Sequence, residues 1–131
     1  MVIQQEHFQI MMEHVQSVYP EEACGLLGGI KNRSEVVIKV SNQLHSPVRF
    51  FMNPVELFEA LTYLEQNQLE LMGVYHSHPT GPATPSQTDL NEFYYPDTKM
   101  LIWSFENKLW QLKAFIIENH HFQEININLV S

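Results

Sequence analysis

Two histidines and an aspartate are spaced in this sequence so that they can meet at one metal ion. His76 and His78 end an apolar segment, and alternate side chains of an extended strand point to the same side. Asp89 follows a proline-rich loop and can add a carboxylate from a second direction. Two histidines, one carboxylate and an open fourth position are typical of catalytic zinc, because structural zinc sites are usually closed by four protein ligands. The pattern predicts one Zn2+ per chain, with room for a water molecule.

Water activated by a metal needs a group that removes its proton and later returns it to the leaving group. Glu22 is the candidate, because a carboxylate that opens an apolar, glycine-bearing segment has no obvious role in core packing. Spacing alone does not place Glu22 beside the histidines.

Together these residues resemble the motif of the JAMM metalloproteases of the MPN domain class. The family pattern is a glutamate in an early Glu-x-Cys-Gly strand, then His-Ser-His-Pro, then a loop that ends in Pro-Ser-x-x-Asp. The matching segments here are Glu22-Ala23-Cys24-Gly25, His76-Ser77-His78-Pro79 and Pro85-Ser86-Gln87-Thr88-Asp89. The segments Arg49-Phe50, Asn53-Pro54 and Leu112-Lys113-Ala114-Phe115 also resemble the family, so the likeness covers nearly the whole chain.

The resemblance implies a role for each motif residue. It implies that His76, His78 and Asp89 bind zinc. It further implies that Glu22 is the general base and then the general acid, and that Ser86 hydrogen-bonds the oxyanion of the tetrahedral intermediate. Ser77 is a further candidate for a hydrogen bond near the metal.

The resemblance also implies a fold and a substrate. The expected fold is a single α/β domain over residues 1–131, an MPN (JAMM) domain in which helices flank a curved mixed β-sheet of cytidine-deaminase-like architecture. Small family members hydrolyse a peptide, isopeptide or amino-acid adduct after the C-terminal glycine of a ubiquitin-like or sulfur-carrier protein. A zinc-dependent peptidase or isopeptidase with such a protein as substrate is therefore expected.

Hydrophobic spacing predicts the elements that must position these residues. Helices are expected over residues 4–19, 54–68 and 87–94, with Pro54 in the first turn of the second and Ser86 capping the third. Strands are expected over residues 23–30, 35–44, 49–52, 69–76, 100–105, 109–118 and 122–130, with a turn at 31–34. This order indicates a mixed α/β domain that ends in antiparallel strands.

Composition limits the classes of function. The chain has 131 residues, with 7 lysines and arginines against 15 aspartates and glutamates, and a net charge of −8. A general nucleic-acid binder needs a basic face, and a membrane span needs ~18 consecutive apolar residues, so neither partner is expected. One cysteine and an N-terminus without a secretory signal predict a cytoplasmic protein. Nothing in the sequence indicates an oligomeric state.

The other histidines and the cysteine have simpler interpretations. Surface positions are expected for His7, His14, His45, His120 and His121. Cys24 could be proposed as a nucleophile, but a lone cysteine in an apolar strand is more often a small buried residue.

Two other functions remain open at this point. The first is a non-catalytic MPN scaffold, which would carry no stoichiometric zinc. The second is a zinc hydrolase for a small amide or a nucleobase, because a glutamate beside activated water also serves deamination. The single cysteine cannot supply the paired cysteine ligands of the zinc deaminases.

Overall fold

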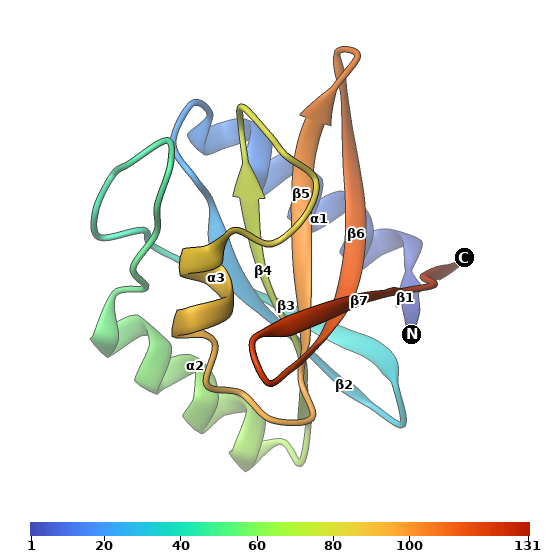
Figure 1. Ribbon diagram of the computed structural model, residues 1–131. Helices are drawn as coiled ribbons and strands as arrows, with labels where there is room; N and C mark the ends of the chain where they lie inside the picture. Colours follow the sequence, from blue (N-terminus) through green and yellow to red (C-terminus); the bar gives the residue numbers. More distant parts are fainter.

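A computed structural model describes all 131 residues. Its strands form one eight-stranded sheet, and helices pack on both faces of this sheet (Figure 1). The helices are α1 (Gln5–Val18), α2 (Pro54–Gln66) and α3 (Gln87–Glu92). The strands are β1 (Val2–Gln4), β2 (Cys24–Ile30), β3 (Arg33–Val40), β4 (Glu70–His78), β5 (Lys99–Glu106), β6 (Leu109–Glu118), β7 (His121–Ile125) and β8 (Asn128–Val130). None of the helices is long and apolar enough to cross a membrane.

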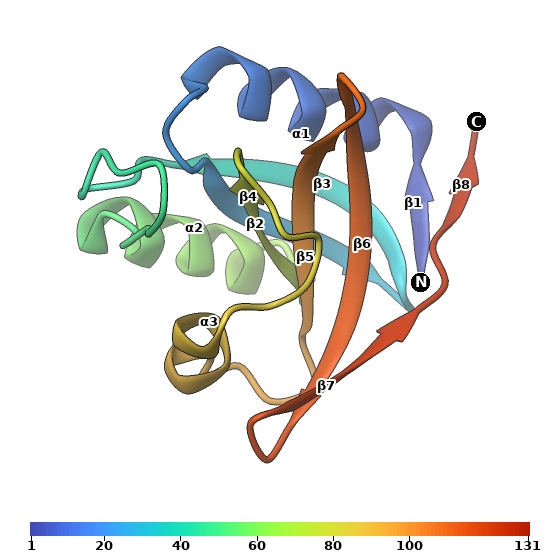
Figure 2. The same cartoon turned by 45° about the horizontal axis from the view of Figure 1, so that its top comes forward.

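The sheet is mixed and strongly curled, as expected from the sequence. Its strand order is β7-β6-β5-β4-β2-β3-β1-β8, in which β4 runs parallel to β5 and antiparallel to β2. Its two edge strands, β7 and β8, are consecutive in the chain and are separated only by residues 126–127. The sheet therefore curls until its edges approach, and β8 lies beside β1 as a parallel strand, with the N- and C-termini at opposite ends of this pair (Figure 2).

Two hydrophobic layers hold the helices to the sheet. On the α1 face, Met11 and Val15 of the helix pack with Tyr75 and Trp103 of the sheet, all fully buried. On the opposite face, called here the α2 face, a second cluster joins α2 to β2, β3 and β4 through Cys24, Leu26, Val40, Ala60, Leu64 and Val74. Because side chains alternate along a strand, Tyr75 faces α1 while its neighbours in β4 face α2.

The start of α2 follows from its first residues. The side chain of Asn53 accepts hydrogen bonds from the backbone amides of Val55 and Glu56, and Pro54 occupies the first helical turn. Asparagine is a strong N-cap, and proline is tolerated in the first turn because its missing N–H has no partner there anyway. The predicted helix start is confirmed.

Several predicted boundaries were wrong. Residues 49–52 form no strand and make only one isolated bridge, between Asn42 and Met52. The predicted strand 122–130 is two strands, β7 and β8, and the three-residue β1 was not predicted. Residues 31–34 are not all turn: only Lys31 and Asn32 lie outside the strands, both at positive φ, and pairing with β2 draws the next two residues into β3. The longer β4 places both motif histidines inside the strand.

Candidate metal centre

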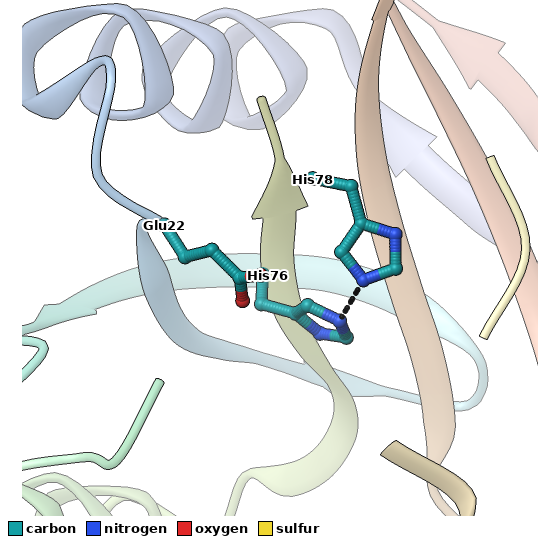
Figure 3. A group of neighbouring side chains, drawn as sticks. All are labelled: Glu22, His76 and His78. Carbon is teal, nitrogen blue, oxygen red and sulfur yellow. Dashed lines mark hydrogen bonds between the residues drawn. The ribbon is translucent and has the colours of Figure 1, made fainter. Parts of the chain in front are cut away.

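The C-terminal end of β4 presents two histidines on the α2 face. His76 and His78 are both buried, and they alternate with Tyr75 and Ser77, which face the other side. The Nε2 atoms of the two imidazoles lie 3.0 Å apart. Figure 3 shows the two rings meeting at these nitrogens. Strand alternation therefore brings the two side chains to one point, as the spacing predicts.

Asp89 reaches the same point from α3. Its Oδ2 lies 3.1 Å from Nε2 of His76 and 3.0 Å from Nε2 of His78. A reciprocal capping box with Ser86 fixes the carboxylate. The Ser86 amide donates to Oδ2 over 2.9 Å, and the Asp89 amide donates to Oγ of Ser86 over 3.0 Å. The predicted helix cap at Ser86 is confirmed, and the same cap orients Asp89.

The donor set fits a zinc ion. Three ligand atoms at about 2.0–2.1 Å from one tetrahedral zinc lie roughly 3.3 Å from one another, close to the separations seen here. Nδ1 of His78 donates a hydrogen bond to the carbonyl of Pro82 over 2.7 Å, so Nε2 carries the lone pair that a metal needs. Two imidazole nitrogens and one carboxylate oxygen are the ligand types that zinc prefers.

Glu22 lies beside this group, although its position in the sequence could not show it. Its carboxylate oxygen and the ligand nitrogens of His76 and His78 all lie within 4.8 Å of one another. Glu22 is 4% exposed, and Figure 3 shows its carboxylate directed toward His76. The Glu22 amide donates to the carbonyl of Ser46 over 2.8 Å. Glu22 thus flanks the convergent atoms, while Asp89 lies closer to both imidazoles.

Burial and mutual charge shift the pKa values of Glu22, His76 and His78. Burial raises the pKa of Glu22 to about 8, while the charge of His78 acts against this rise and that of Asp89 adds to it. Burial lowers the pKa of His76. Burial also acts to lower the pKa of His78, but hydrogen bonds to Asp89 and Pro82 outweigh it and the pKa is raised. Glu22 can therefore hold or release a proton near neutral pH, as acid–base catalysis requires.

Ser77 does not face the metal centre. Its Oγ accepts a hydrogen bond from the amide of Ala23 over 2.8 Å, and its own amide donates to the carbonyl of Ala23. The expectation of a hydrogen bond near the metal was wrong, because strand alternation turns Ser77 away from the histidines. Ser77 instead holds Ala23, the residue after Glu22, against β4 through these two hydrogen bonds.

Two histidines predicted on the surface are not there. His7 is buried and its Nδ1 is hydrogen-bonded to Oγ of Ser34 over 2.7 Å. His14 is half-buried and its Nδ1 is hydrogen-bonded to the hydroxyl of Tyr75 over 2.6 Å. Both lie on the side of α1 that faces the sheet. His45, His120 and His121 are exposed as expected.

Cys24 is a packing residue. It is fully buried, and its Sγ lies 3.4 Å from the carbonyl oxygen of Val40. Burial raises the pKa of the thiol to about 12, with the charges of Glu22 and Glu56 adding to the rise. The reactive form of cysteine is the thiolate, so Cys24 is poorly suited to be a nucleophile. Gly25, next to it, leaves room for the ring of Tyr75, with which any Cβ would collide.

A cavity of about 550 Å³, which the sequence did not predict, opens beside the metal centre. One wall is the segment 44–57, the other is residues 89–95 after β4, and the floor includes Val74 and Met100. His76 and Asp89 line one end, where the ring of Phe50 stacks on His76 at 4.7 Å between centroids. An Arg49–Glu92 ion pair joins the two walls. The aromatic pairs Phe50-Phe51 and Tyr94-Tyr95 are a sequence signal from which such walls could have been predicted, and it was missed.

The chain matches one known protein family over the residues that form this site. The family described as "Prokaryotic homologs of the JAB domain" matches residues 4–115, most of the chain and all of the motif. The chain therefore belongs to this family, and its resemblance to the small JAMM/MPN proteins is confirmed.

Individual proteins agree with this membership. A desampylase of Pyrococcus furiosus is 36% identical over 129 residues, which cover 97% of this chain and 89% of the relative. A CysO-cysteine peptidase of Mycobacterium tuberculosis is 27% identical over 133 residues, covering 99% of this chain and 91% of the relative. The solution structure of protein DSY2949 from Desulfitobacterium hafniense superimposes with a TM-score of 0.87 at 32% identity, covering 99% and 93% of the two chains.

Proposed function

We propose that this protein is a zinc-dependent peptidase or isopeptidase that hydrolyses the bond after the C-terminal glycine of a ubiquitin-like or sulfur-carrier protein. The observation that carries the proposal is the convergence of His76, His78 and Asp89 on one point, with Glu22 beside them. The similarity to a desampylase and to a CysO-cysteine peptidase supports the choice of substrate. A single buried cysteine suits a reducing cytoplasm.

His76, His78 and Asp89 would hold one zinc ion. When bound, the ion would supply Lewis acidity, which makes water a better nucleophile and polarises the scissile carbonyl. Glu22 takes the proton from the attacking water and returns it to the leaving nitrogen. A pKa raised to about 8 suits both steps, because each form of the carboxyl is then accessible near neutral pH.

Ser86 would act on the oxyanion of the tetrahedral intermediate. Its Oγ already accepts a hydrogen bond from the Asp89 amide, so its own proton remains available for donation. Ser86 is exposed to solvent, which leaves the hydroxyl free to turn toward a substrate. One hydroxyl thus caps α3 and can serve the reaction.

The apolar cavity suits the tail of the substrate. It ends at His76 and Asp89, and most of its lining is hydrophobic or aromatic. An extended tail that ends in glycine could lie in it with its last carbonyl at the metal centre, because glycine has no side chain to exclude. Leu44, Val48, Phe51, Val55 and Phe58 extend this apolar character to the surface of the same segment and of α2.

The decisive experiment is a cleavage panel with metal analysis. The substrates are ubiquitin-like and sulfur-carrier proteins joined through their C-terminal glycine to a peptide, to a lysine side chain or to a cysteine. The zinc-loaded protein should cleave at least one of the three. Glu22→Gln should keep stoichiometric zinc and lose about 10² to 10⁴-fold in turnover. Glu21→Gln, a change of the neighbouring exposed carboxylate, is the matched control and should stay active.

Two outcomes would contradict the proposal in different ways. A purified chain that binds no stoichiometric zinc would be a non-catalytic scaffold. Equal turnover by Glu22→Gln and Glu21→Gln would remove Glu22 from the reaction while leaving the metal centre in place.

A further inference from the structure

Asn42 belongs to no motif, but all the donors and acceptors of its buried side-chain amide are hydrogen-bonded. It lies just after β3 and is 8% exposed. Its Nδ2 donates to the carbonyl oxygens of Glu22 and Arg49, each over 3.1 Å. Its Oδ1 accepts from the amides of Leu44 and Phe51, each over 3.1 Å. A carboxamide offers two N–H donors and two lone pairs, so every hydrogen-bonding position of Asn42 is occupied.

The groups that Asn42 joins belong to two parts of the site. One is the peptide that carries Glu22. The other is the segment 43–52, which walls the apolar cavity and stacks Phe50 on His76. This segment contains no strand and folds back on itself, with Gln43 donating to the carbonyl of Phe51 over 2.8 Å. Asn42 is therefore the centre around which the cavity wall is built.

Few other contacts fix the distance between the two parts. The Glu22 amide donates to the carbonyl of Ser46, and the only ladder contact of the segment is the isolated bridge between Asn42 and Met52. The outer side of the segment is exposed and apolar, with Val48 75% and Phe51 53% accessible. One further contact joins the segment to the residue before Glu22: Nδ1 of His45 lies 2.9 Å from Oε1 of Glu21, and both side chains are partly accessible. A displacement of the wall by a bound tail is therefore transmitted to Glu22 through Asn42, the Ser46 contact and this pair.

We propose that Asn42 is a positioning residue that couples the substrate-binding segment 43–52 to the acid/base Glu22. The inference rests on the proposed function, because it assumes a tail in the cavity and Glu22 in the reaction. An amide is required at this position, since only an amide offers two donors and two acceptors at one short side chain. Aspartate would lose both donors, and alanine would leave four backbone groups without their partner, of which the carbonyl of Glu22 belongs to a buried residue.

The first test measures hydrogen exchange in the metal-free protein, so it does not depend on catalysis. In Asn42→Ala, the amides of Leu44 and Phe51 lose their acceptor and should exchange about tenfold faster, the effect of losing one hydrogen bond. Asn42→Asp keeps an acceptor for these two amides but loses both donors. The Glu22 amide should exchange about tenfold faster in both variants, because the peptide of Glu22 loses its contact with Asn42. Asn53→Ala is the matched control, because it removes the side-chain cap of α2 and has no contact with Glu22. Unchanged exchange at Glu22 in both Asn42 variants would overturn the coupling.

The second test measures turnover per bound zinc. Asn42→Asp should keep zinc affinity and lose about 10²-fold in kcat, the scale of a displacement of one ångström at a catalytic group. The rise of kcat with pH should also move to higher pH, because a new carboxylate near Glu22 opposes its ionisation. Asn53→Ala should keep the wild-type pH profile even if it is equally destabilised. A wild-type profile in Asn42→Asp would reduce Asn42 to a structural residue.

A third measurement needs no Asn42 variant and applies even if those variants do not fold. A synthetic peptide that ends in Gly-Gly is added to the Glu22→Gln protein. Exchange should slow at Leu44, at Phe51 and at the residue 22 amide together. Slowing at the first two with no change at residue 22 would refute the coupling. If the peptide slows none of them, the proposed occupant of the cavity is wrong and the coupling fails with it. If the peptide slows exchange at all three amides but the zinc-loaded wild type cleaves none of the substrates, only the proposed function is contradicted.

Discussion

The two faces of the sheet each hold a pair of hydrogen-bonded histidines, all of them buried except the half-buried His14, and the pairs differ in one respect. On the α1 face, His7 and His14 each have a separate hydroxyl partner, Ser34 and Tyr75. On the α2 face, His76 and His78 turn the same ring nitrogen toward each other and share Oδ2 of Asp89. Burial and hydrogen bonding are common to both faces, so neither marks the functional pair. The functional pair is marked by the convergence of its metal-ligating nitrogens and an aspartate oxygen on one point.

The largest difference between the faces should be in metal affinity. Asp89→Ala or His76→Ala should weaken zinc binding by more than about 100-fold, since losing only a hydrogen-bond partner of a ligand already costs 10 to 100-fold. His14→Ala should leave zinc affinity unchanged, because His14 lies on the other face. Competition with a chelator of known affinity measures both. Equal losses in the three variants would mean that convergence does not distinguish the pairs.

Ser86 tests whether one hydroxyl has two roles on the α2 face. Ser86→Ala should lower turnover by about 10² to 10³-fold through loss of an oxyanion donor, and stability by about 1 kcal/mol through loss of the cap. Ser86→Gly should lower turnover equally but cost only a few tenths of a kcal/mol, because glycine is a tolerated N-cap. Steady-state kinetics and urea unfolding of the two variants separate the roles. Full activity in Ser86→Gly would leave Ser86 as a cap alone.

On the α1 face, removing a histidine should affect stability and not chemistry. His7→Ala leaves the buried hydroxyl of Ser34 without its imidazole partner and should lower the free energy of unfolding by about 1–3 kcal/mol. Zinc content and turnover at a temperature where the variant stays folded should match the wild type. A loss of zinc in His7→Ala would show that the two faces are not independent.

The smallest expected effect is a pH dependence of stability from His14. Burial, with the charge of Lys39 adding to it, lowers the pKa of His14 to about 4. The unfolded chain therefore binds a proton that the folded chain does not, between about pH 6.5 and 4, and this contribution to stability is lost as pH falls through that range. Urea unfolding of metal-free wild type and His14→Gln at pH 7 and 5 isolates the effect. A wild type no more acid-sensitive than His14→Gln would mean that His14 titrates alike in both states.

The sequence predicted the α2 face better than the α1 face. His76 and His78 have a spacing that works only through strand alternation, and Ser86 has the chemistry of a cap, so local rules placed them. Both elements exist, and the cap is where it was expected. His7 and His14 were predicted on the surface because the helical stripe was drawn through apolar residues alone. A histidine on the inner side of the helix needs a hydrogen-bond partner there. The hydroxyls of Ser34 and Tyr75 are these partners, and only the fold shows that they face α1.

Long-range placement was the other limit of prediction. No spacing rule puts Glu22 beside residues more than fifty positions later, and the resemblance to a family was needed for that step. Asn42 was missed for a related reason: it has no motif, and its importance comes from four partners scattered between residues 22 and 51. The three-residue β1 is too short for a period to be recognised, and it becomes a strand through its neighbours β3 and β8.

The pairing of β1 with β8 joins two strands that are translated at different times. Residues 2–4 are translated well before residues 128–130, yet these segments lie side by side as parallel strands. All of the motif, from Glu22 to Asp89, is translated before β8. β1 therefore gains its outer neighbour only after the other seven strands have been translated, and contacts between such distant parts of a chain form slowly. Until then, β1 is an open edge available to another chain.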